Sequence, residues 1–347
     1  MVSDVFTGDF DKHRLVLGYL SPDVPIELIL AAGASPLRLK GDWSGETPLA
    51  DEYIKPGFNP VARAVFNRLL DGTYSFVDRV IFSNLDESNL RLFYLTREIK
   101  RQGLSTVIPD IYCFEFLHTQ SSYNLDRLRD FRRHLEEWTG APISDEALRD
   151  AIALVNDNRR LRKQVAALRT ESPPRLAGSA ALRELLSKAD DLTPREGTAR
   201  IYLEGSSLDD PAFYEMVEAC NVTIVGENSD WGARYYDTLT EADGDPLEAI
   251  CRRYMCTPPH PSKSTVQQRV DYCLRQVEAA RADAVIFVML EGDHPPHWDY
   301  PEQQRALHAR GIPTLCLPWQ RIDMARDDAV RAQVATFTES IAVGAVS

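Results

Sequence analysis

The sequence lacks the long apolar runs that a membrane-spanning helix requires. No window of its 347 residues approaches the roughly 18 or more consecutive apolar residues of a membrane span. Residues 1–20 are acidic and have no basic segment ahead of their apolar run, so they do not follow the pattern of a secretory signal. Both absences predict a cytoplasmic protein that has no membrane partner.

An excess of basic charge is also absent. The chain carries 52 acidic and 39 basic residues, which gives a net charge of −13. Proteins that bind nucleic acids release counterions from phosphates through clustered Lys and Arg, so this charge balance argues against a nucleic-acid partner. The densest basic stretch, residues 158–169, places Leu161, Val165 and Leu168 at helical spacing, which favours a solvated helix face.

The sequence contains neither a CxxC pair nor the glycine-rich motifs of nucleotide sites. A G-x-G-x-x-G fingerprint and a Walker A loop are both missing, so nothing marks a dinucleotide site or an ATP site of these kinds. We expect the cysteines to be buried structural thiols, and a metal or redox role for Cys251 and Cys256 is the alternative. The six cysteines are Cys113, Cys220, Cys251, Cys256, Cys273 and Cys316.

What the sequence does contain is an alternation of apolar, strand-like runs with longer helical segments, which predicts an α/β fold with parallel sheets. We expect two such domains, at residues 1–140 and 196–347, and a helical connection at 141–195. Strands are expected at 35–41, 78–84, 104–111, 199–206, 221–228, 283–290 and 312–318. Helices are expected at 23–34, 59–72, 87–103, 209–220, 262–282 (with Ser264 and Gln267 as a capping box), 299–311 and 328–344.

Acids, amides and hydroxyls gather just after several of the expected strands. Ligands of open parallel sheets bind beyond the carboxyl ends of the strands, and domain junctions favour pockets. We therefore expect both halves to line one ligand-binding cleft. The expected cleft residues are Ser83, Asn84, Asp86, Ser206, Asn228, Arg234 and Trp298, and the candidates for acid–base catalysis are Glu204, Asp293 and His294.

Two histidines, His294 and His297, lie three residues apart beside Asp293 and Asp299. Such side chains could ligate zinc or iron(II). Two prolines stand between the histidines, which argues against a helical spacing that would direct both imidazoles to one ion. We expect a polar loop here and no bound metal.

A series of phrases runs in order along the chain: PIELILAAGASPLRLKG, NPVARAVFNRLLDG, VIFSNLDESNLRL, YEMVEACNVTIVGEN, WGARYY, DAVIFVMLEGDHPPHWDYP and GIPTLCLP. Together they resemble the large subunits of the 2-hydroxyacyl-CoA dehydratase and benzoyl-CoA reductase family. The resemblance implies two Rossmann-like domains with helical additions, which agrees with the alternation described above.

The same resemblance implies a chemistry. Family members work as pairs of homologous subunits, each typically holding a [4Fe-4S] cluster through three cysteines. A separate ATP-hydrolysing activator delivers single electrons. The electron lets a CoA thioester lose water, or an aromatic ring be reduced, through a radical anion.

This chain departs from the family at the three cluster-ligand positions. Asn59 stands at the first, Leu85 at the second, before the Asp86 that follows the family's cysteine, and Asp293 at the third. Leucine cannot ligate iron, and asparagine is a poor replacement for a thiolate. We therefore expect no cofactor on this chain and a [4Fe-4S] cluster on a homologous, cysteine-bearing partner subunit. The alternative is a cluster ligated by Cys113, Cys251 and Cys256.

Three functions agree with these observations. The first, which we favour, is a subunit of a dehydratase or reductase complex that acts on an acyl-CoA thioester. The second is a cluster-free binding or scaffold protein of the same fold. The third is an enzyme that uses acid–base chemistry in the cleft between its domains.

Overall fold

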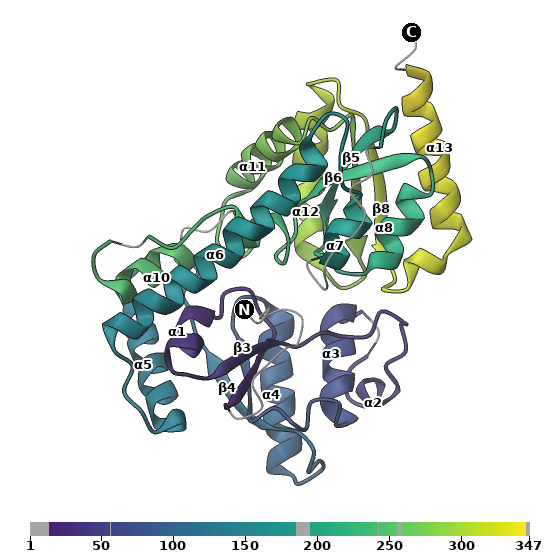
Figure 1. Ribbon diagram of the computed structural model, residues 1–347. Coiled ribbons are helices and arrows are strands. Elements are labelled where there is room, and N and C mark those ends of the chain that lie inside the picture. The colour runs from purple at the N-terminus through teal and green to yellow at the C-terminus, as the bar shows by residue number, and fades with distance from the viewer. Residues whose placement is uncertain (1–13, 56, 185–194, 242, 256–258, 345–347) are drawn as a thin grey trace. The chain divides into compact units, whose positions relative to one another are not determined.

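The structure, a computed structural model, describes residues 14–55, 57–184, 195–241, 243–255 and 259–344. Within these ranges lie two sheets of four parallel strands surrounded by helices, which confirms the predicted α/β fold (Figure 1). No helix in the described ranges is both long enough and apolar enough to span a bilayer.

The described chain divides into two compact units. The first is made of residues up to 42, 46–159 and 238–257, and the second of 43–45, 160–237 and 258 onwards. The boundaries expected at residues 140 and 195 stay a prediction, and residues 185–194 of the expected connection lie outside the described residues.

The first unit contains a sheet with the strand order β2-β1-β3-β4. Its strands are β1 (Val16–Tyr19), β2 (Ser35–Arg38), β3 (Arg79–Ser83) and β4 (Asp110–Phe114). Its helices are α1 (Ile26–Ala31), α2 (Pro48–Asp51), α3 (Pro60–Leu70), α4 (Glu87–Arg101), α5 (Ser122–Thr139), α10 (Pro246–Met255) and the first part of α6 (Asp145–Thr170).

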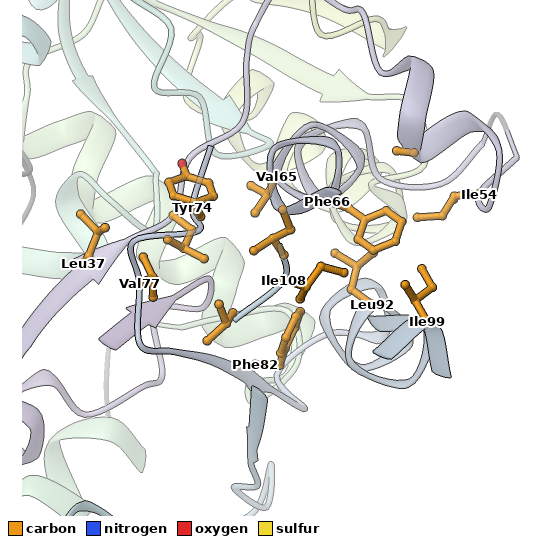
Figure 2. Packing of buried hydrophobic residues seen from close by; sticks show 14 of the residues in the cluster. Leu37, Ile54, Val65, Phe66, Tyr74, Val77, Phe82, Leu92, Ile99 and Ile108 are labelled. Carbon is orange, nitrogen blue, oxygen red and sulfur yellow. The ribbon is translucent and has the colours of Figure 1, made fainter. Parts of the chain in front are cut away.

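The core of this unit forms where two amphipathic helices cover the sheet. Figure 2 shows Phe66 of α3, Phe82 of β3 and Leu92 of α4 in one apolar cluster, and all three are fully buried. Burying a side chain of this size contributes about 1.5–3 kcal/mol. The cluster therefore fixes β3, and with it the loop that follows β3, against the helices.

Within the first unit, a buried ionic network connects α1 and α6 to Thr240 and Tyr254. Arg159 lies 2.9 Å from Glu27 in an ion pair that has essentially no exposure to solvent. Glu27 also accepts hydrogen bonds from Thr240 Oγ1 at 3.1 Å and from Tyr254 Oη at 2.8 Å. Burial by itself disfavours the charged form of Glu27, but the charge of Arg159 and the hydrogen bond from Tyr254 help to outweigh it, so the pKa of the carboxyl is lowered.

The second unit repeats the topology, with the strand order β6-β5-β7-β8. Every residue of β6 and β7 is buried, as is usual for parallel strands covered on both faces. Its strands are β5 (Ala199–Gly205), β6 (Val222–Glu227), β7 (Ala284–Leu290) and β8 (Thr314–Gln320). Its helices are α7 (Gly178–Glu184), α8 (Pro211–Glu218), α9 (Ala233–Tyr236), α11 (Val266–Ala279), α12 (His294–His308), a short 3-10 turn (Met324–Arg326) and α13 (Asp328–Gly344).

Some predicted elements are wrong in position. The strand expected at 104–111 begins only at Asp110, because Pro109 has no N–H to donate to the sheet. The helix expected from 299 begins at His294, because proline is well tolerated in a first helical turn. The capping box at the start of α11 pairs Thr265 with Gln268, one residue later than expected. β1 is a strand that the sequence pattern did not predict.

Candidate functional site

In each sheet, the connections that follow the two central strands run toward opposite edges of the sheet. In the first unit the position where they diverge lies between β1 and β3, and in the second between β5 and β7. Loops diverge at such a switch point and leave room for a ligand beyond the carboxyl ends of the strands. The residues that follow β1, β3, β5 and β7 are therefore the primary candidates for a site.

In the first unit, the loop after β3 is bound directly to the loop after β1. Ser83 Oγ donates a 2.7 Å hydrogen bond to Asp23 Oδ1, and both side chains are buried. Asn89 Nδ2 donates to Ser21 Oγ at 3.0 Å, and the backbone N–H of Leu85 donates to Ser83 Oγ at 3.2 Å. Ser83 therefore fixes the turn at the switch point.

The other two cleft candidates of the first unit also have structural partners. Asp86 is the N-cap of α4 and accepts a 2.8 Å hydrogen bond from the backbone N–H of Asn89, as expected of a partly buried acid in this position. Asn84 Oδ1 accepts from the backbone N–H of Phe116 at 2.9 Å, which ties the loop after β3 to the chain beyond β4. These bonds hold the loop in one conformation.

No thiolate stands at the three positions where the resemblance implies cluster ligands. Asn59 is the N-cap of α3 and accepts from the backbone N–H groups of Val61 and Ala62 at 3.0 and 3.1 Å. Leu85 is an apolar side chain only 3% exposed. Asp293 accepts a 2.6 Å hydrogen bond from Ser206 Oγ. Since none of the three provides a thiolate, the chain offers no cluster ligands at these positions.

The cysteines were expected to be buried structural thiols, with cluster ligation by Cys113, Cys251 and Cys256 as the alternative, and the structure describes all of them except Cys256. Cys113, Cys220, Cys251 and Cys316 are half-buried rather than fully buried, Cys273 is buried, and Cys256 lies outside the described residues. Burial, with the nearby charges of Glu115 and Asp23, raises the pKa of Cys113 to about 11, which favours the neutral thiol. Among the described side chains, no group of three or more His, Cys, Asp or Glu is placed to hold a metal ion.

In the second unit, the end of β5 carries a buried acid. Glu204 is only 5% exposed, and its Oε1 accepts hydrogen bonds from Asn228 Nδ2 at 2.7 Å and from Gln303 Nε2 at 3.0 Å. Burial raises the pKa of Glu204 to about 7, although the bonds from the two amides and the charge of Arg234 act in the opposite direction. A carboxyl group with a pKa near neutrality can both donate and accept a proton, as acid–base catalysis requires.

A second polar cluster lies beside Glu204. Arg234 Nε is 3.0 Å from Asp230 Oδ1, and Ser207 Oγ donates to Asp230 Oδ2 at 3.0 Å. His260 Nε2 is 3.7 Å from Asp230 Oδ1. Burial favours the neutral form of Asp230, but the charges of Arg234 and His260 outweigh it and lower the pKa. Arg234 therefore has a carboxylate partner four residues earlier in the chain.

The chain leaves β5 through a position that only glycine can occupy. Gly205 has a φ of +112°, and a Cβ built there would lie 2.2 Å from the carbonyl oxygen of Val288 on β7. The close approach lets Ser206 Oγ accept a 3.0 Å hydrogen bond from the backbone N–H of Leu290 while it donates to Asp293. Ser206 thus links the ends of β5 and β7 across the switch point.

Aromatic side chains surround the start of α12. The rings of His297 and Trp319 are 3.9 Å apart, and Trp319 has an unusual φ of +54° for a bulky residue. Both His294 and His297 belong to the first turn of α12, so our expectation of a loop between them is wrong; prolines fit this turn. Burial lowers the pKa of His297, and Trp298 is 79% exposed.

The structure thus brings some predicted site residues together within each unit. Glu204 contacts Asn228, and Ser206 contacts Asp293. The side-chain partner of Ser83 is Asp23, which the sequence pattern did not predict as a site residue. The sequence pattern also did not predict Gln303, Asp230 and His260 as site residues. The signal for Asp23 was available, since it closely follows a short apolar run that proves to be β1. The shared cleft stays a prediction.

Comparison with known proteins places these sites in a family. The family model for 2-hydroxyglutaryl-CoA dehydratase, D-component, matches residues 23–341. The chain is 23% identical to the (R)-phenyllactyl-CoA dehydratase beta subunit of Clostridium sporogenes, covering 98% of this chain and 99% of the relative. It is 23% identical to a benzoyl-CoA reductase subunit of Thauera aromatica, covering 95% and 92%. It is 24% identical to the beta subunit of (R)-2-hydroxyglutaryl-CoA dehydratase of Acidaminococcus fermentans, covering 95% and 93%. The match over nearly the whole chain means that the protein belongs to the 2-hydroxyglutaryl-CoA dehydratase D-component family.

Proposed function

We propose that this protein is a subunit of a 2-hydroxyacyl-CoA dehydratase or benzoyl-CoA reductase type of complex, located in the cytoplasm, that acts on a CoA thioester. In this proposal it carries no [4Fe-4S] cluster of its own and pairs with a homologous, cluster-bearing subunit. The partner supplies the redox centre, and an ATP-hydrolysing activator supplies the electron.

The observation that carries the proposal is that no cysteine stands at the three positions where the resemblance implies cluster ligands. The chain nevertheless matches its family from residue 23 to residue 341. Asn59 caps a helix, Leu85 is buried, and Asp293 bonds to Ser206. Asn59 and Asp293 make polar contacts of their own, and none of the three side chains is a thiolate. The three relatives described above are named as subunits, which supports a partner for this chain as well.

A specific observation favours one further candidate, which is acid–base chemistry at Glu204. Its pKa of about 7 is in the range in which a carboxyl group exchanges protons effectively at neutral pH. Asp293 and His294 follow β7, the strand that pairs with the end of β5, so they are proposed to support the same site.

Reconstitution tests the proposal. The chain is purified without oxygen and combined with a cysteine-bearing homologue, an activator, ATP, a strong reductant and a series of 2-hydroxyacyl-CoA and aryl-CoA thioesters. We expect product only when both subunits, the activator and ATP are all present. Full activity of the homologue and activator without this chain would refute the proposal. Product from this chain alone, without ATP or reductant, would favour acid–base catalysis at Glu204.

A further inference from the structure

Three buried glutamates of the second unit have different kinds of partner. Glu227 forms a buried ion pair with Arg169. Glu218 accepts hydrogen bonds from the backbone N–H groups of Gly178 at 2.7 Å and Ile224 at 3.1 Å. Both arrangements provide a positive charge or several donors to a carboxylate. Glu204 differs, since its closest hydrogen-bond partners are neutral amide side chains.

The pairing of Glu204 with Asn228 leaves two acceptor atoms unsatisfied. Asn228 Nδ2 donates to Glu204 Oε1, but Glu204 Oε2 and Asn228 Oδ1 are buried and accept no hydrogen bond from an N–H or O–H group of the described residues. The Cys273 thiol, a weak donor, is a further polar contact of the Glu204 carboxyl. Buried polar atoms almost always have a partner, because an unsatisfied one keeps the full cost of its removal from water. Here both unsatisfied atoms are acceptors, and they belong to the two groups that already share one bond.

One proton satisfies both acceptors. A protonated carboxyl group is a donor as well as an acceptor, and a primary amide has the same two functions side by side. When an acid and an amide meet edge to edge, the amide N–H donates to one carboxyl oxygen while the acid O–H donates to the amide oxygen. We infer that Glu204 binds and releases a proton in the neutral pH range and, when protonated, donates it to Asn228 Oδ1, so that the end of β5 is a proton-binding site.

The surroundings of Glu204 agree with a neutral acid. Burial is the largest influence on its pKa and raises it to about 7. Tyr202 of β5 and Tyr272 and Cys273 of α11 are uncharged neighbours, and burial raises the pKa of each of them. Among the charged groups, Arg234 of α9 lowers the pKa of Glu204, but its positive charge is already compensated by Asp230.

Release of this proton changes the loop that follows β6. Asn228 begins the loop that carries Asp230 and leads to Arg234 of α9. Ionisation would place two oxygen acceptors, Glu204 Oε2 and Asn228 Oδ1, against each other. It would also add one negative charge beside Asp230. Because the groups that carry this inference all lie in the second unit, it does not depend on the proposed dehydratase or reductase function.

Carbon-13 NMR of protein labelled at the glutamate side-chain carboxyl tests the inference. The signal of Glu204 is identified by its loss in the Glu204→Gln variant, and Glu87→Gln, on the exposed face of α4, is the control for the assignment. We expect the Glu204 signal to stay at the position of a neutral acid at about pH 6 and to move to that of a carboxylate with a midpoint near 7.

If Glu204→Gln does not fold, the carboxyl signals of the wild-type protein alone test the inference. One glutamate signal must then titrate near neutrality while the protein remains folded. A spectrum in which every glutamate is already a carboxylate at about pH 6 would overturn the inference, and so would a midpoint for Glu204 near its ordinary pKa of 4.5.

Discussion

Replacing Glu204 by glutamine should remove a specific part of the pH dependence of stability. Below about pH 4.5 the carboxyl is protonated in both the folded and the unfolded chain, so it contributes no difference. As the pH rises, the unfolded chain ionises first, because its pKa is lower. The folded protein therefore loses stability between pH 4.5 and about 7, and the loss is complete above the folded-state pKa.

The magnitude follows from the size of the pKa change. One pKa unit corresponds to about 1.36 kcal/mol, so a rise from 4.5 to about 7 corresponds to about 3 kcal/mol. Glutamine does not titrate, and its side-chain N–H can donate to Asn228 Oδ1 as the protonated acid does. We expect Glu204→Gln to resemble the wild type at about pH 4.5 and to be about 3 kcal/mol more stable above about pH 8.

Urea unfolding at several pH values, followed by circular dichroism, measures this difference. Glu227→Gln is the matched control, since it removes the partner of the buried Arg169 and should destabilise the protein by about 3–5 kcal/mol. A difference between wild type and Glu204→Gln that does not change with pH would refute the reasoning, because it would mean that Glu204 titrates equally in both states.

Three further substitutions test the structural account. Arg159→Met leaves Glu27 buried without its ion-pair partner, and we expect the free energy of unfolding in denaturant to fall by about 3–5 kcal/mol. Arg160→Met, at the neighbouring position, is the control. Asn59→Ala removes the N-cap of α3 and should cost about 1 kcal/mol by the same measurement; an unchanged midpoint would contradict the capping role. Gly205→Ala places a Cβ against Val288, so we expect a strongly lowered melting temperature, and a stable variant would show that β5 does not leave the sheet as described.

The sequence predicted those helices and strands that a pattern of neighbouring residues identifies. Buried apolar runs such as 80–82 and 284–290 identify strands, and Asn59 before Pro60 marks the start of a helix. β1 was missed because four residues, one of them Gly18, give too short a pattern. The start of α12 was misjudged because prolines that break a helix interior are well accommodated in its first turn.

The candidate sites were predictable only in part, for a related reason. Glu204 lies near the end of β5 and Asn228 directly follows the neighbouring strand β6, so strand topology alone brings them close. The partner of Ser83 depends on pairing β3 with β1, and Gln303 reaches Glu204 from a helix far along the chain. Such contacts depend on the tertiary arrangement, which local patterns do not encode. The protonation of Glu204 depends on burial, which the sequence does not show.

The most direct test of the proposed role is the iron and sulfide content of the chain. The protein is expressed alone, purified without oxygen and analysed, and the same measurement is made on its complex with a cysteine-bearing homologue. We predict no stoichiometric iron on the isolated chain, since Asn59, Leu85 and Asp293 provide no thiolates, and a [4Fe-4S] cluster in the complex that resides on the partner. About four irons and four sulfides per isolated chain, with the broad visible absorption of such clusters, would contradict the account.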